Sequence, residues 1–531
     1  MPKLRINGRE IEVADGVTVL QAARELNAEV PTLCYLEGYP AFTSCMVCMV
    51  RDIASGRDLP SCSTPVADGM DIVTDAGEIR KGRKDTLDLL LSEHVGNCEG
   101  PCHRACPADV NVPWVVAMVE QGRLDEVAAH LNLRLAFPSM VERICVAPCE
   151  RTCRRDEYDS AVSIRQLLRF VADDDLKRGS PSLPRPAAAT GKRVAVVGTG
   201  PTGMAAAFHL LLRGHACTLF DERGVMGGNV RRHIPPSVLP PEILDAEIDK
   251  LRNLGADVRL GTRIGRDMSI EDLPAEFDAI VLAVGKLKPE TPAIFGLRGG
   301  RYGLAVRPGT MQTSIENLFT GGDAVRPFQS AAWSVADGRL IADGVHRFLN
   351  GEPTLTPRRR FNSRVGRLQE DELERFVEGY DRRDRVSPKG GDAAGYDRDE
   401  ALLEAGRCLH CECLKADTCK LRIYADSYGA AQDGYLHRVR STYRRVLQHA
   451  DVIFEPGKCI KCGLCVRIAR QHGETTGLTF VDRGFDVRVD VPFDRSLAEG
   501  LRTVARECVD ACPTAALSFK SDSLRKMSPP P

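Results

Sequence analysis

The 531-residue sequence predicts a multidomain protein of mixed α/β and α+β class. Its length is typical of about three to five domains. Most of its 20 cysteines fall in groups towards the two ends of the chain, whereas residues 154–407 hold only Cys217. This cysteine-poor middle contains a strand, a glycine-rich turn and a helix in succession, which is the pattern of a parallel α/β sheet.

The composition excludes several classes of protein. The chain has 72 basic and 73 acidic side chains, so it lacks the basic excess typical of nucleic-acid-binding proteins. Its 43% hydrophobic content is too high for a disordered chain, and no apolar run reaches the roughly 18 residues of a membrane span. The N-terminus has no secretory signal pattern. We therefore expect a reducing, cytoplasmic location, where many cysteines indicate metal or redox centres rather than disulfides.

Residues 1–78 are predicted to form the first domain, with two short strands joined at Asn7-Gly8 and a helix in VTVLQAARELNA. Four cysteines follow with the spacing C-x10-C-x2-C-x13-C, and four thiolates can hold an iron–sulfur cluster. Zinc is the alternative, but its ligands more often form two close C-x2-C pairs. The segment resembles the N-terminal 2Fe–2S domain of the large iron–sulfur subunit of complex I and of iron-only hydrogenases. This implies a β-grasp fold with the ligands Cys34, Cys45, Cys48 and Cys62.

Residues 79–185 are predicted to be mostly helical, with the cysteine strings HVGNCEGPCHRACP and ICVAPCERTC. The segment resembles the N-terminal domain of the glutamate synthase small subunit and of dihydropyrimidine dehydrogenase. That resemblance implies a helical domain with two 4Fe–4S clusters. One cluster would be held by Cys98, Cys102 and Cys153, and the other by Cys106, Cys145 and Cys149.

Two positions of this segment depart from the family pattern. Where the family has a further cysteine, this chain has Val95, and His94 precedes it. A His-x3-Cys string also occurs in the complex I large subunit, where the histidine is a cluster ligand, so His94 is a candidate ligand; the alternative is a surface histidine near a helix end. Leu168 stands where the family often has Glu or Gln, which leaves the second cluster without a clear fourth ligand, and Gln166 is a weak substitute.

Residues 190–352 follow a Pro/Ala-rich linker and carry a G-x-G-x-x-G turn between a strand and a helix. Glycines in this turn allow close approach of a pyrophosphate to the helix N-terminus. Asp221, 23 residues after Gly198, is placed to hold a ribose hydroxyl. The alternative is a sheet turn that binds no nucleotide. The segment resembles the FAD domain of the same glutamate synthase family, which implies FAD bound by Gly198, Gly200, Gly203, Asp221, Gly227, Gly228, Gly322, Asp323, Ala336, Asp337 and Gly338.

The second nucleotide-binding unit of that family is missing from the sequence. The family inserts an NADPH-binding Rossmann unit between its two FAD portions. Here only 35 residues separate Gly285 from Gly321, and they contain no second G-x-G-x-x-G. A single βαβ unit needs about 30 or more residues. The sequence therefore predicts a Rossmann-like FAD domain without the NADPH insert.

Residues 353–450 are predicted to be a charged linker followed by a cysteine-rich segment. The string C-x2-C-x-C-x5-C could hold a 4Fe–4S cluster or structural zinc, and the other cysteine groups favour iron–sulfur. His410 is interpreted as a bystander. The candidate ligands are Cys408, Cys411, Cys413 and Cys419.

Residues 451–520 resemble a bacterial two-cluster ferredoxin domain, as found in complex I and hydrogenase subunits, and residues 521–531 form a tail. In that pattern the fourth cysteine of a run ligates the other cluster. Ala469 and Ala505 replace two cysteines, which implies that one cluster is lost and that Cys508 has no partners. The implied ligands of the remaining 4Fe–4S cluster are Cys459, Cys462, Cys465 and Cys512. Cys217 is predicted to be a core residue.

The sequence thus predicts FAD, one 2Fe–2S cluster and three to four 4Fe–4S clusters on one chain. The leading hypothesis is an electron-transfer subunit of a cytoplasmic oxidoreductase complex, with partners of the NADH-oxidising flavoprotein, hydrogenase or formate dehydrogenase type, and soluble ferredoxin as a further candidate. Flavin-based bifurcation is left open. The alternatives are an NAD(P)H-dependent reductase akin to the glutamate synthase small subunit, and a zinc-stapled scaffold.

Overall fold

The computed structural model describes residues 1–178, 182–287, 291–327, 330–353, 359–435 and 440–520. The predicted tail, 521–531, lies outside these residues. The chain divides into two compact units. Unit 1 consists of residues 1–99, 359–380 and 411–526, and unit 2 consists mainly of residues 100–358 and 381–410.

Unit 1 begins with a five-stranded mixed sheet in the order β2-β1-β5-β3-β4. The predicted hairpin at Asn7-Gly8 joins its first two strands, and a capping box between Thr18 and Gln21 starts the predicted helix. The apolar faces of the sheet and helix form one buried core. These elements are β1 (Lys3–Ile6), β2 (Arg9–Glu12), α1 (Val19–Glu25), β3 (Met49–Asp52), β4 (Arg57–Pro60) and β5 (Asp71–Val73).

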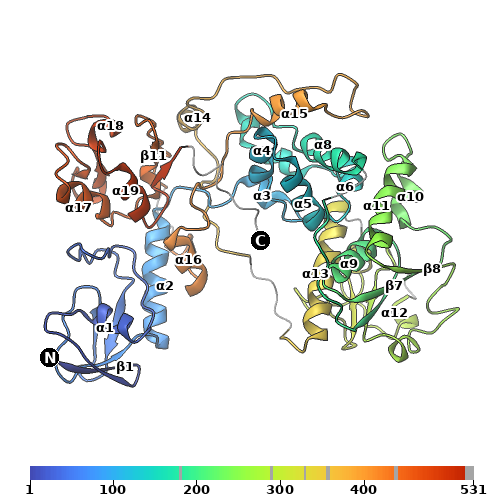
Figure 1. Ribbon diagram of the computed structural model, residues 1–531, viewed down its shortest axis with the longest axis horizontal. Coiled ribbons are helices and arrows are strands. Elements are labelled where there is room, and N and C mark those ends of the chain that lie inside the picture. The colour runs from blue at the N-terminus through green and yellow to red at the C-terminus, as the bar shows by residue number, and fades with distance from the viewer. Residues whose placement is uncertain (179–181, 288–290, 328–329, 354–358, 436–439, 521–531) are drawn as a thin grey trace. The chain divides into compact units, whose positions relative to one another are not determined.

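Two helices far apart in the sequence pack together in unit 1, α2 (Gly77–Ser92) and α16 (Lys420–Tyr428) (Figure 1). Arg83 of α2 is 1% exposed. Its burial is compensated by hydrogen bonds that it donates to the Met49 carbonyl at 2.8 Å and to the Tyr428 hydroxyl at 3.0 Å. These bonds hold α2 to β3 and α16. The predicted domain boundary at residue 78 therefore falls within α2, and the unit boundary lies after Glu99.

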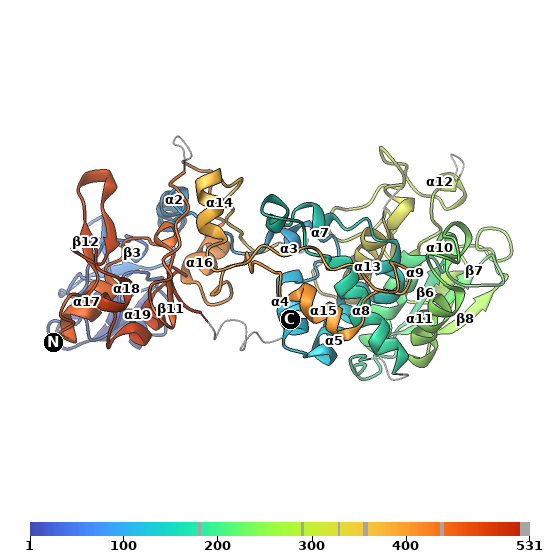
Figure 2. The same ribbon diagram turned by 90° about the horizontal axis from the view of Figure 1, so that it is seen from above.

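The C-terminal part of unit 1 has two antiparallel two-stranded sheets, β11–β14 and β12–β13. Figures 1 and 2 show α17, α18, α19 and β11 gathered at one end of the unit. Their apolar side chains form a separate core. The elements are α14 (Glu370–Phe376), β11 (Val452–Phe454), η4 (Pro456–Lys458), α17 (Leu464–Gln471), β12 (Thr479–Val481), η5 (Gly484–Asp486), β13 (Arg488–Asp490), α18 (Leu497–Gly500), α19 (Ala505–Ala511) and β14 (Leu517–Phe519).

Unit 2 begins with a layer of helices built around the fully buried Trp114, whose ring meets His130 edge-on at 5.2 Å. Arg407, 1% exposed, pairs with Glu404 at 2.8 Å and Asp159 at 3.1 Å and so fastens α15 to this layer. The elements are α3 (Pro101–Ala105), α4 (Val112–Glu120), α5 (Leu124–Leu135), α6 (Pro138–Ile144), α7 (Pro148–Arg151), η1 (Arg154–Glu157), α8 (Ile164–Lys177) and α15 (Arg398–Ala405).

The rest of unit 2 is a parallel five-stranded sheet in the order β10-β9-β6-β7-β8, as the strand–turn–helix pattern predicts. α9 and α13 pack against each other beside the sheet (Figures 1 and 2). The elements are β6 (Arg193–Val197), α9 (Pro201–Leu212), β7 (Ala216–Asp221), α10 (Gly228–His233), α11 (Pro241–Asn253), β8 (Asp257–Leu260), η2 (Leu273–Ala275), β9 (Ala279–Leu282), α12 (Thr291–Ile294), β10 (Leu318–Thr320), η3 (Gly322–Ala324) and α13 (Ala331–Leu349).

The connection from β9 to β10 is short. Its described residues contain α12 and no strand beyond isolated bridges. β10 pairs directly with β9, so the chain returns to the same sheet.

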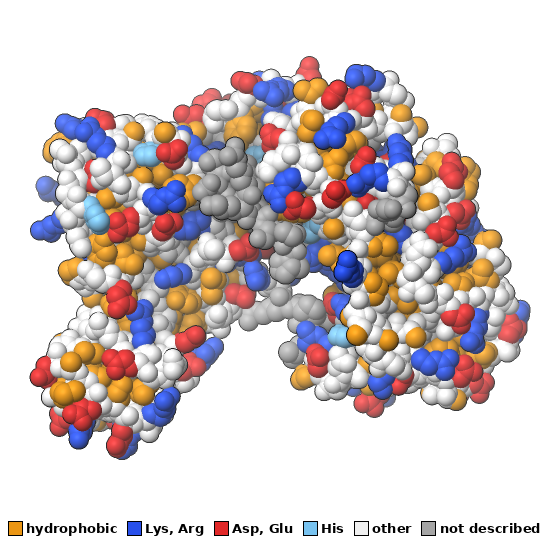
Figure 3. Space-filling view, viewed as in Figure 1, with side chains coloured by type: hydrophobic (Ala, Val, Ile, Leu, Met, Phe, Trp, Pro, Cys, Tyr) orange, Lys and Arg blue, Asp and Glu red, His pale blue; other side chains and the backbone are white. Residues whose placement is uncertain are grey.

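Charged side chains of both signs intermingle on the face shown in Figure 3, in keeping with a net charge of −1. Among the helices of the described residues, none has the length and apolar character needed to cross a membrane.

The close contact of α13 with α9 gives a first prediction. A Cβ on Gly338 would lie 2.5 Å from the Thr202 carbonyl oxygen and 2.7 Å from the Ala205 Cβ, so Gly338→Ala must separate the helices. We expect a cost of about 1–3 kcal/mol, the usual range for overpacking. Calorimetry should show a lower unfolding temperature. Gly299→Ala is the control, because a Cβ there meets nothing within 4 Å. Equal unfolding temperatures for both variants would contradict this packing.

Candidate functional site

The first four predicted ligands, Cys34, Cys45, Cys48 and Cys62, form one group, the N-terminal site. Each is at most 3% exposed. Hydrogen bonds from the thiols of Cys45 and Cys62 lower the pKa of Cys34, and a hydrogen bond from Cys62 lowers that of Cys48 to about 7. Backbone N–H groups of residues 44 and 45 also point at the Cys34 sulfur. The same hydrogen bonds, with burial, raise the pKa of Cys45 and of Cys62, so the thiolate form is favoured at Cys34 and Cys48. Thiolates are the form that binds iron.

Side chains from the C-terminal part of unit 1 contact the loop of the N-terminal site that contains Cys34 and Phe42. Arg467 donates to the Cys34 carbonyl at 2.8 Å, and its guanidinium lies 5.7 Å from the Phe42 ring. Phe42 also stacks on Phe480, with ring centroids 5.7 Å apart. A buried core contains Cys34 and Cys45 together with Cys419 and Cys462. Residues more than 350 positions apart thus fix this loop.

A second group in unit 1 brings together residues that the sequence assigned to different clusters. The Cys413 N–H donates to the Cys98 carbonyl at 3.2 Å, and burial with the neighbouring Cys413 and Cys98 thiols raises the pKa of Cys419 to about 12. Nδ1 of His94 is buried without a hydrogen-bond partner. Such an orphaned imidazole nitrogen, on a residue four positions before Cys98, is a fitting metal donor. We call this group the His94 site: His94, Cys98, Cys413 and Cys419.

Segment 359–365 covers the His94 site. Ser363, fully buried, directs its N–H to the Cys98 sulfur at 3.4 Å, and its hydroxyl lies 3.3 Å from the same sulfur. The Ser363 hydroxyl also donates to the Gly96 carbonyl at 2.9 Å. Ser363 was missed from the sequence because no spacing connects it to a cysteine.

In unit 2, Cys106, Cys145 and Cys149 form a third group, as predicted. Burial, with the neighbouring Glu142 carboxylate, raises the pKa of Cys106 to about 11 and that of Cys145 to about 12. Glu142 is 5% exposed and precedes Cys145 by three residues, which was the only sequence signal for it. Leu168 is 3% exposed.

The remaining predicted ligands of unit 2 include Cys102, Cys153 and Cys408. Burial raises the pKa of Cys153, and the nearby Cys408 contributes to this shift. The unit boundary falls between His410 and Cys411, so the cysteines predicted to share a site at 408–419 fall in both units. His410 lies 3.7 Å from Glu120, and the amide of Gln166 donates to Asp392 at 3.4 Å.

The C-terminal site consists of Cys459, Cys462, Cys465 and Cys512, which line one small apolar cavity. Burial raises the pKa of Cys459 to about 11. Cys508 does not line this cavity; it is fully buried, and its thiol donates to the Cys465 carbonyl at 3.8 Å. Cys217 is also buried, as expected of a core residue.

The donors of these groups are soft thiolates with one imidazole, the ligand types of iron–sulfur clusters. Within the part of the chain that the structure describes, no three His, Cys, Asp or Glu side chains are arranged to hold a single metal ion. The donor chemistry and the orphaned nitrogen of His94 fit clusters.

The predicted glycine turn joins β6 to α9. A Cβ on Gly203 would lie 2.0 Å from the Gly198 carbonyl oxygen, whereas a Cβ on Gly200 would meet nothing within 4 Å. Gly203 thus allows the turn to close, and Gly200 leaves room at the helix N-terminus, where a pyrophosphate is stabilised. Asp221 accepts from the Thr199 N–H at 2.9 Å and its hydroxyl at 2.6 Å and so holds the turn.

This turn lines a cavity of about 540 Å³ at the carboxyl ends of the strands. Of the predicted residues, Gly198, Gly200, Asp221, Gly228 and Asp323 line it. The cavity also has basic side chains suited to phosphate groups, which the sequence reading missed because they lie in loops without a recognised pattern: Arg223, Arg263, Arg266 and Lys286.

The other predicted cofactor residues lie around the cavity wall rather than in it: Gly203, Gly227, Gly322, Ala336, Asp337 and Gly338. Asp337 is 1% exposed, accepts from the Gly322 N–H at 3.0 Å and pairs with Arg326 at 3.3 Å. It thereby holds the turn that presents Asp323. Gly338 lies in the contact of α13 with α9.

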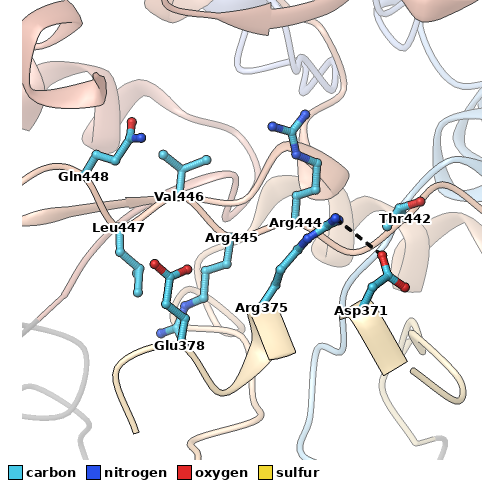
Figure 4. A pocket seen from close by; sticks show the side chains of 9 residues that line it. All are labelled: Asp371, Arg375, Glu378, Thr442, Arg444, Arg445, Val446, Leu447 and Gln448. Atoms are coloured by element: carbon cyan, nitrogen blue, oxygen red, sulfur yellow. Dashed lines mark ion pairs between the residues drawn. The ribbon is translucent and has the colours of Figure 1, made fainter. Parts of the chain in front are cut away.

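Unit 1 also has an open cavity of about 600 Å³, which no cysteine lines (Figure 4). On α14, Arg375 and Asp371 point toward each other and form an ion pair of 3.4 Å. The lining residues are Asp371, Arg375, Glu378, Thr442, Arg444, Arg445, Val446, Leu447 and Gln448.

Three segments match known domain families. Residues 2–77 match the 2Fe-2S iron-sulfur cluster binding domain, and residues 79–180 match dihydropyrimidine dehydrogenase domain II, 4Fe-4S cluster. Residues 196–245 match the NAD(P)-binding Rossmann-like domain. The matched part of the chain, within residues 2–245, thus consists of two iron–sulfur cluster domains and one dinucleotide-binding domain. The matches confirm the predicted 2Fe–2S, 4Fe–4S and dinucleotide-binding domains.

Relatives with these domains are oxidoreductase subunits. NADP(+)-dependent formate dehydrogenase subunit beta of Moorella thermoacetica is 36% identical over 206 residues, 35% of this chain and 29% of that protein. The glutamate synthase [NADPH] small chain of Mycobacterium tuberculosis is 36% identical over 184 residues, 35% of this chain and 38% of that protein. The chain thus spans well under half of either relative.

Among solved structures, an NAD+-reducing [NiFe]-hydrogenase in the H2-reduced state aligns with 98% of this chain and 88% of its own. The identity is 11% and the TM-score is 0.36.

The grouping of the cysteines gives a second prediction. Because Cys98 lies with Cys413, we expect Cys98→Ser and Cys413→Ser to remove the same iron–sulfur signal from the electron paramagnetic resonance spectrum of the reduced protein. Cys408→Ser should remove a different signal. Cys508→Ser, outside the C-terminal cavity, is the control and should keep every signal. A shared loss for Cys98→Ser and Cys408→Ser, with Cys413→Ser unaffected, would reject the grouping.

The bonds of Asp221 to Thr199 give a third prediction. Asp221→Ala leaves the buried Thr199 N–H without its acceptor, which destabilises the folded turn by about 1–3 kcal/mol. We expect dinucleotide affinity to fall roughly 10-fold or more, since 1.4 kcal/mol is a factor of ten. Equilibrium dialysis with FAD measures it. Asp257→Ala removes an exposed carboxylate from β8 and should retain affinity. Equal affinities in the two variants would contradict this role.

Proposed function

We propose that the chain is an electron-transfer subunit of a cytoplasmic oxidoreductase complex. The observation that carries the proposal is the shared core of unit 1, in which cysteines of the N-terminal, His94 and C-terminal sites pack together. Electron transfer between centres needs such proximity, and the protein controls their spacing and potentials. When bound, iron–sulfur clusters supply one-electron transfer and a flavin supplies the exchange between one-electron and two-electron chemistry.

The proposed ligands follow the groups found in the structure. The N-terminal site would hold the 2Fe–2S cluster, and the His94 and C-terminal sites would each hold a 4Fe–4S cluster. In unit 2, Cys106, Cys145 and Cys149 would hold another. Cys102, Cys153 and Cys408 would contribute to a further cluster. This assignment transfers Cys98 from the partners that the family resemblance implied to those that it contacts.

We further propose that FAD occupies the 540 Å³ cavity. The glycine turn and the basic side chains that line the cavity suit a dinucleotide pyrophosphate. The direct return of the chain from β9 to β10 favours a single dinucleotide in this unit. Electrons would then be exchanged with partner subunits of the NADH-oxidising flavoprotein, hydrogenase or formate dehydrogenase type.

The competing function is an NAD(P)H-dependent reductase. The glutamate synthase small chain and the NADP(+)-dependent formate dehydrogenase subunit, by their names, use NADP(H) and share these domains. The two functions differ in whether NADPH reduces the isolated chain.

A fourth prediction separates the two functions. In the anaerobically purified chain, we expect dithionite to bleach the flavin and to reduce one 2Fe–2S and several 4Fe–4S centres. NADPH alone should leave the flavin oxidised until a partner subunit is added. Absorbance at the flavin band, with iron and acid-labile sulfide counted, measures this. Rapid bleaching by NADPH alone would favour the reductase, and a colourless zinc-containing preparation would reject both functions.

A further inference from the structure

A buried lysine lies against the His94 site. Lys458 is 4% exposed and forms an ion pair with Glu455. The Glu455 carboxylate, 7% exposed, also accepts from the buried Tyr443 hydroxyl at 3.2 Å. A buried charge is costly unless it is paired, so the fold retains this pair at some expense.

The stem of Lys458 is in close contact with the segment that carries His94 and Cys98. A Cβ on Gly96 would lie 2.8 Å from the Lys458 Cε, 3.1 Å from its Cγ and 3.2 Å from the His94 Nε2. The preceding turn is fixed as well, because the Val95 N–H donates to the Gly457 carbonyl at 2.7 Å. Gly96 thus leaves the space through which the lysine reaches the site.

The ammonium of Lys458 is close enough to act on two thiols of the His94 site. After the larger effect of Glu455, the Cys413 and Cys98 thiols each help to raise the pKa of Lys458. The next residue, Cys459, belongs to the C-terminal site. Lys458 is therefore close to two proposed clusters: it lies beside the His94 site in the structure, and it precedes the first ligand of the C-terminal site in the sequence.

We propose that Lys458 is a positioning residue that raises the reduction potential of the cluster in the His94 site, and that Glu455 limits this effect. The inference rests on the proposed ligand assignment. A reduced cluster carries one more negative charge than an oxidised one, and a fixed ammonium stabilises that extra charge. The interaction is strong because both groups are shielded from water. Arg445 also interacts with Glu455, so this carboxylate balances two cations.

The test is a pair of substitutions with opposite expected effects, read by redox titration of the anaerobic full chain with electron paramagnetic resonance. Lys458→Met keeps the stem but removes the positive charge, so the midpoint potential of one 4Fe–4S signal should shift downward. Glu455→Gln keeps an acceptor for Tyr443 but removes the negative charge, so the same signal should shift upward. That signal should be the one removed by Cys98→Ser.

Lys461→Met is the matched control. It removes a lysine from the same loop, but Lys461 is 37% exposed and pairs with Glu93 at 3.3 Å, and its charge acts on Cys459 of the C-terminal site instead of on the His94 site. In Lys461→Met, the midpoint potential of the signal that Cys98→Ser removes should shift much less than it does in Lys458→Met. Iron content is measured for every variant.

The outcomes separate this inference from the function on which it rests. Full iron content with potentials in Lys458→Met equal to those of the control, or shifts of the same sign in both charge variants, would overturn the role of Lys458. If instead the unaltered chain binds no iron or Cys98→Ser removes no signal, the ligand assignment itself fails. Loss of iron only in Lys458→Met would point to a structural role and would also reject the proposal.

Discussion

The small core that joins α2 and α16 to four cysteines is the contact on which unit 1 depends. Leu87 and Leu91 of α2 and Leu421 and Ala425 of α16 pack with the sulfur-bearing loops. These loops are short and irregular, and none has enough apolar surface to fix its own conformation. Their order comes from burial against the two helices. The same burial shields the thiols from water, which is also the environment in which charges such as that of Lys458 act strongly.

Unit 2 is organised by a different constraint, the close approach of two helices to one glycine turn. α9 starts at the turn, and α13 packs on it through Gly338, while Asp337 of α13 holds the next turn along the cavity. The dinucleotide cavity is thus formed by backbone geometry, with side chains such as Asp221 and Thr199 fixing the loops. This differs from unit 1, where side-chain burial fixes the sites.

Local patterns in the sequence were sufficient for the elements that depend on near neighbours. The hairpin at Asn7-Gly8, the capped helix after Thr18 and the glycine turn before α9 need only short-range sterics and hydrogen bonds, and the structure has them. The family resemblance, rather than spacing, implied the group of Cys106, Cys145 and Cys149, and the structure brings these three together. The resemblance that grouped Cys98 and the spacing that grouped Cys408 both differ from the structure, because each cysteine packs beside residues that are hundreds of positions away. Ser363 and Lys458 were missed for the same physical reason: their roles come from tertiary contact with the His94 site, which no local pattern encodes.

The backbone hydrogen bond between Cys413 and Cys98 has a consequence for biogenesis. The chain leaves unit 1 after Glu99 and returns to it for good at Cys411, so two neighbouring donors of one site are synthesised more than 300 residues apart. Because domains fold as their residues emerge from the ribosome, unit 2 can be complete while unit 1 still lacks half of its core. Until Arg467 and Phe480 have been synthesised, the N-terminal loop with Cys34 lacks the contacts that fix it, and its thiols are accessible to solvent. Under the proposed ligand assignment, iron loading of unit 1 therefore requires that residues 411–520 have been synthesised and have packed against residues 1–99.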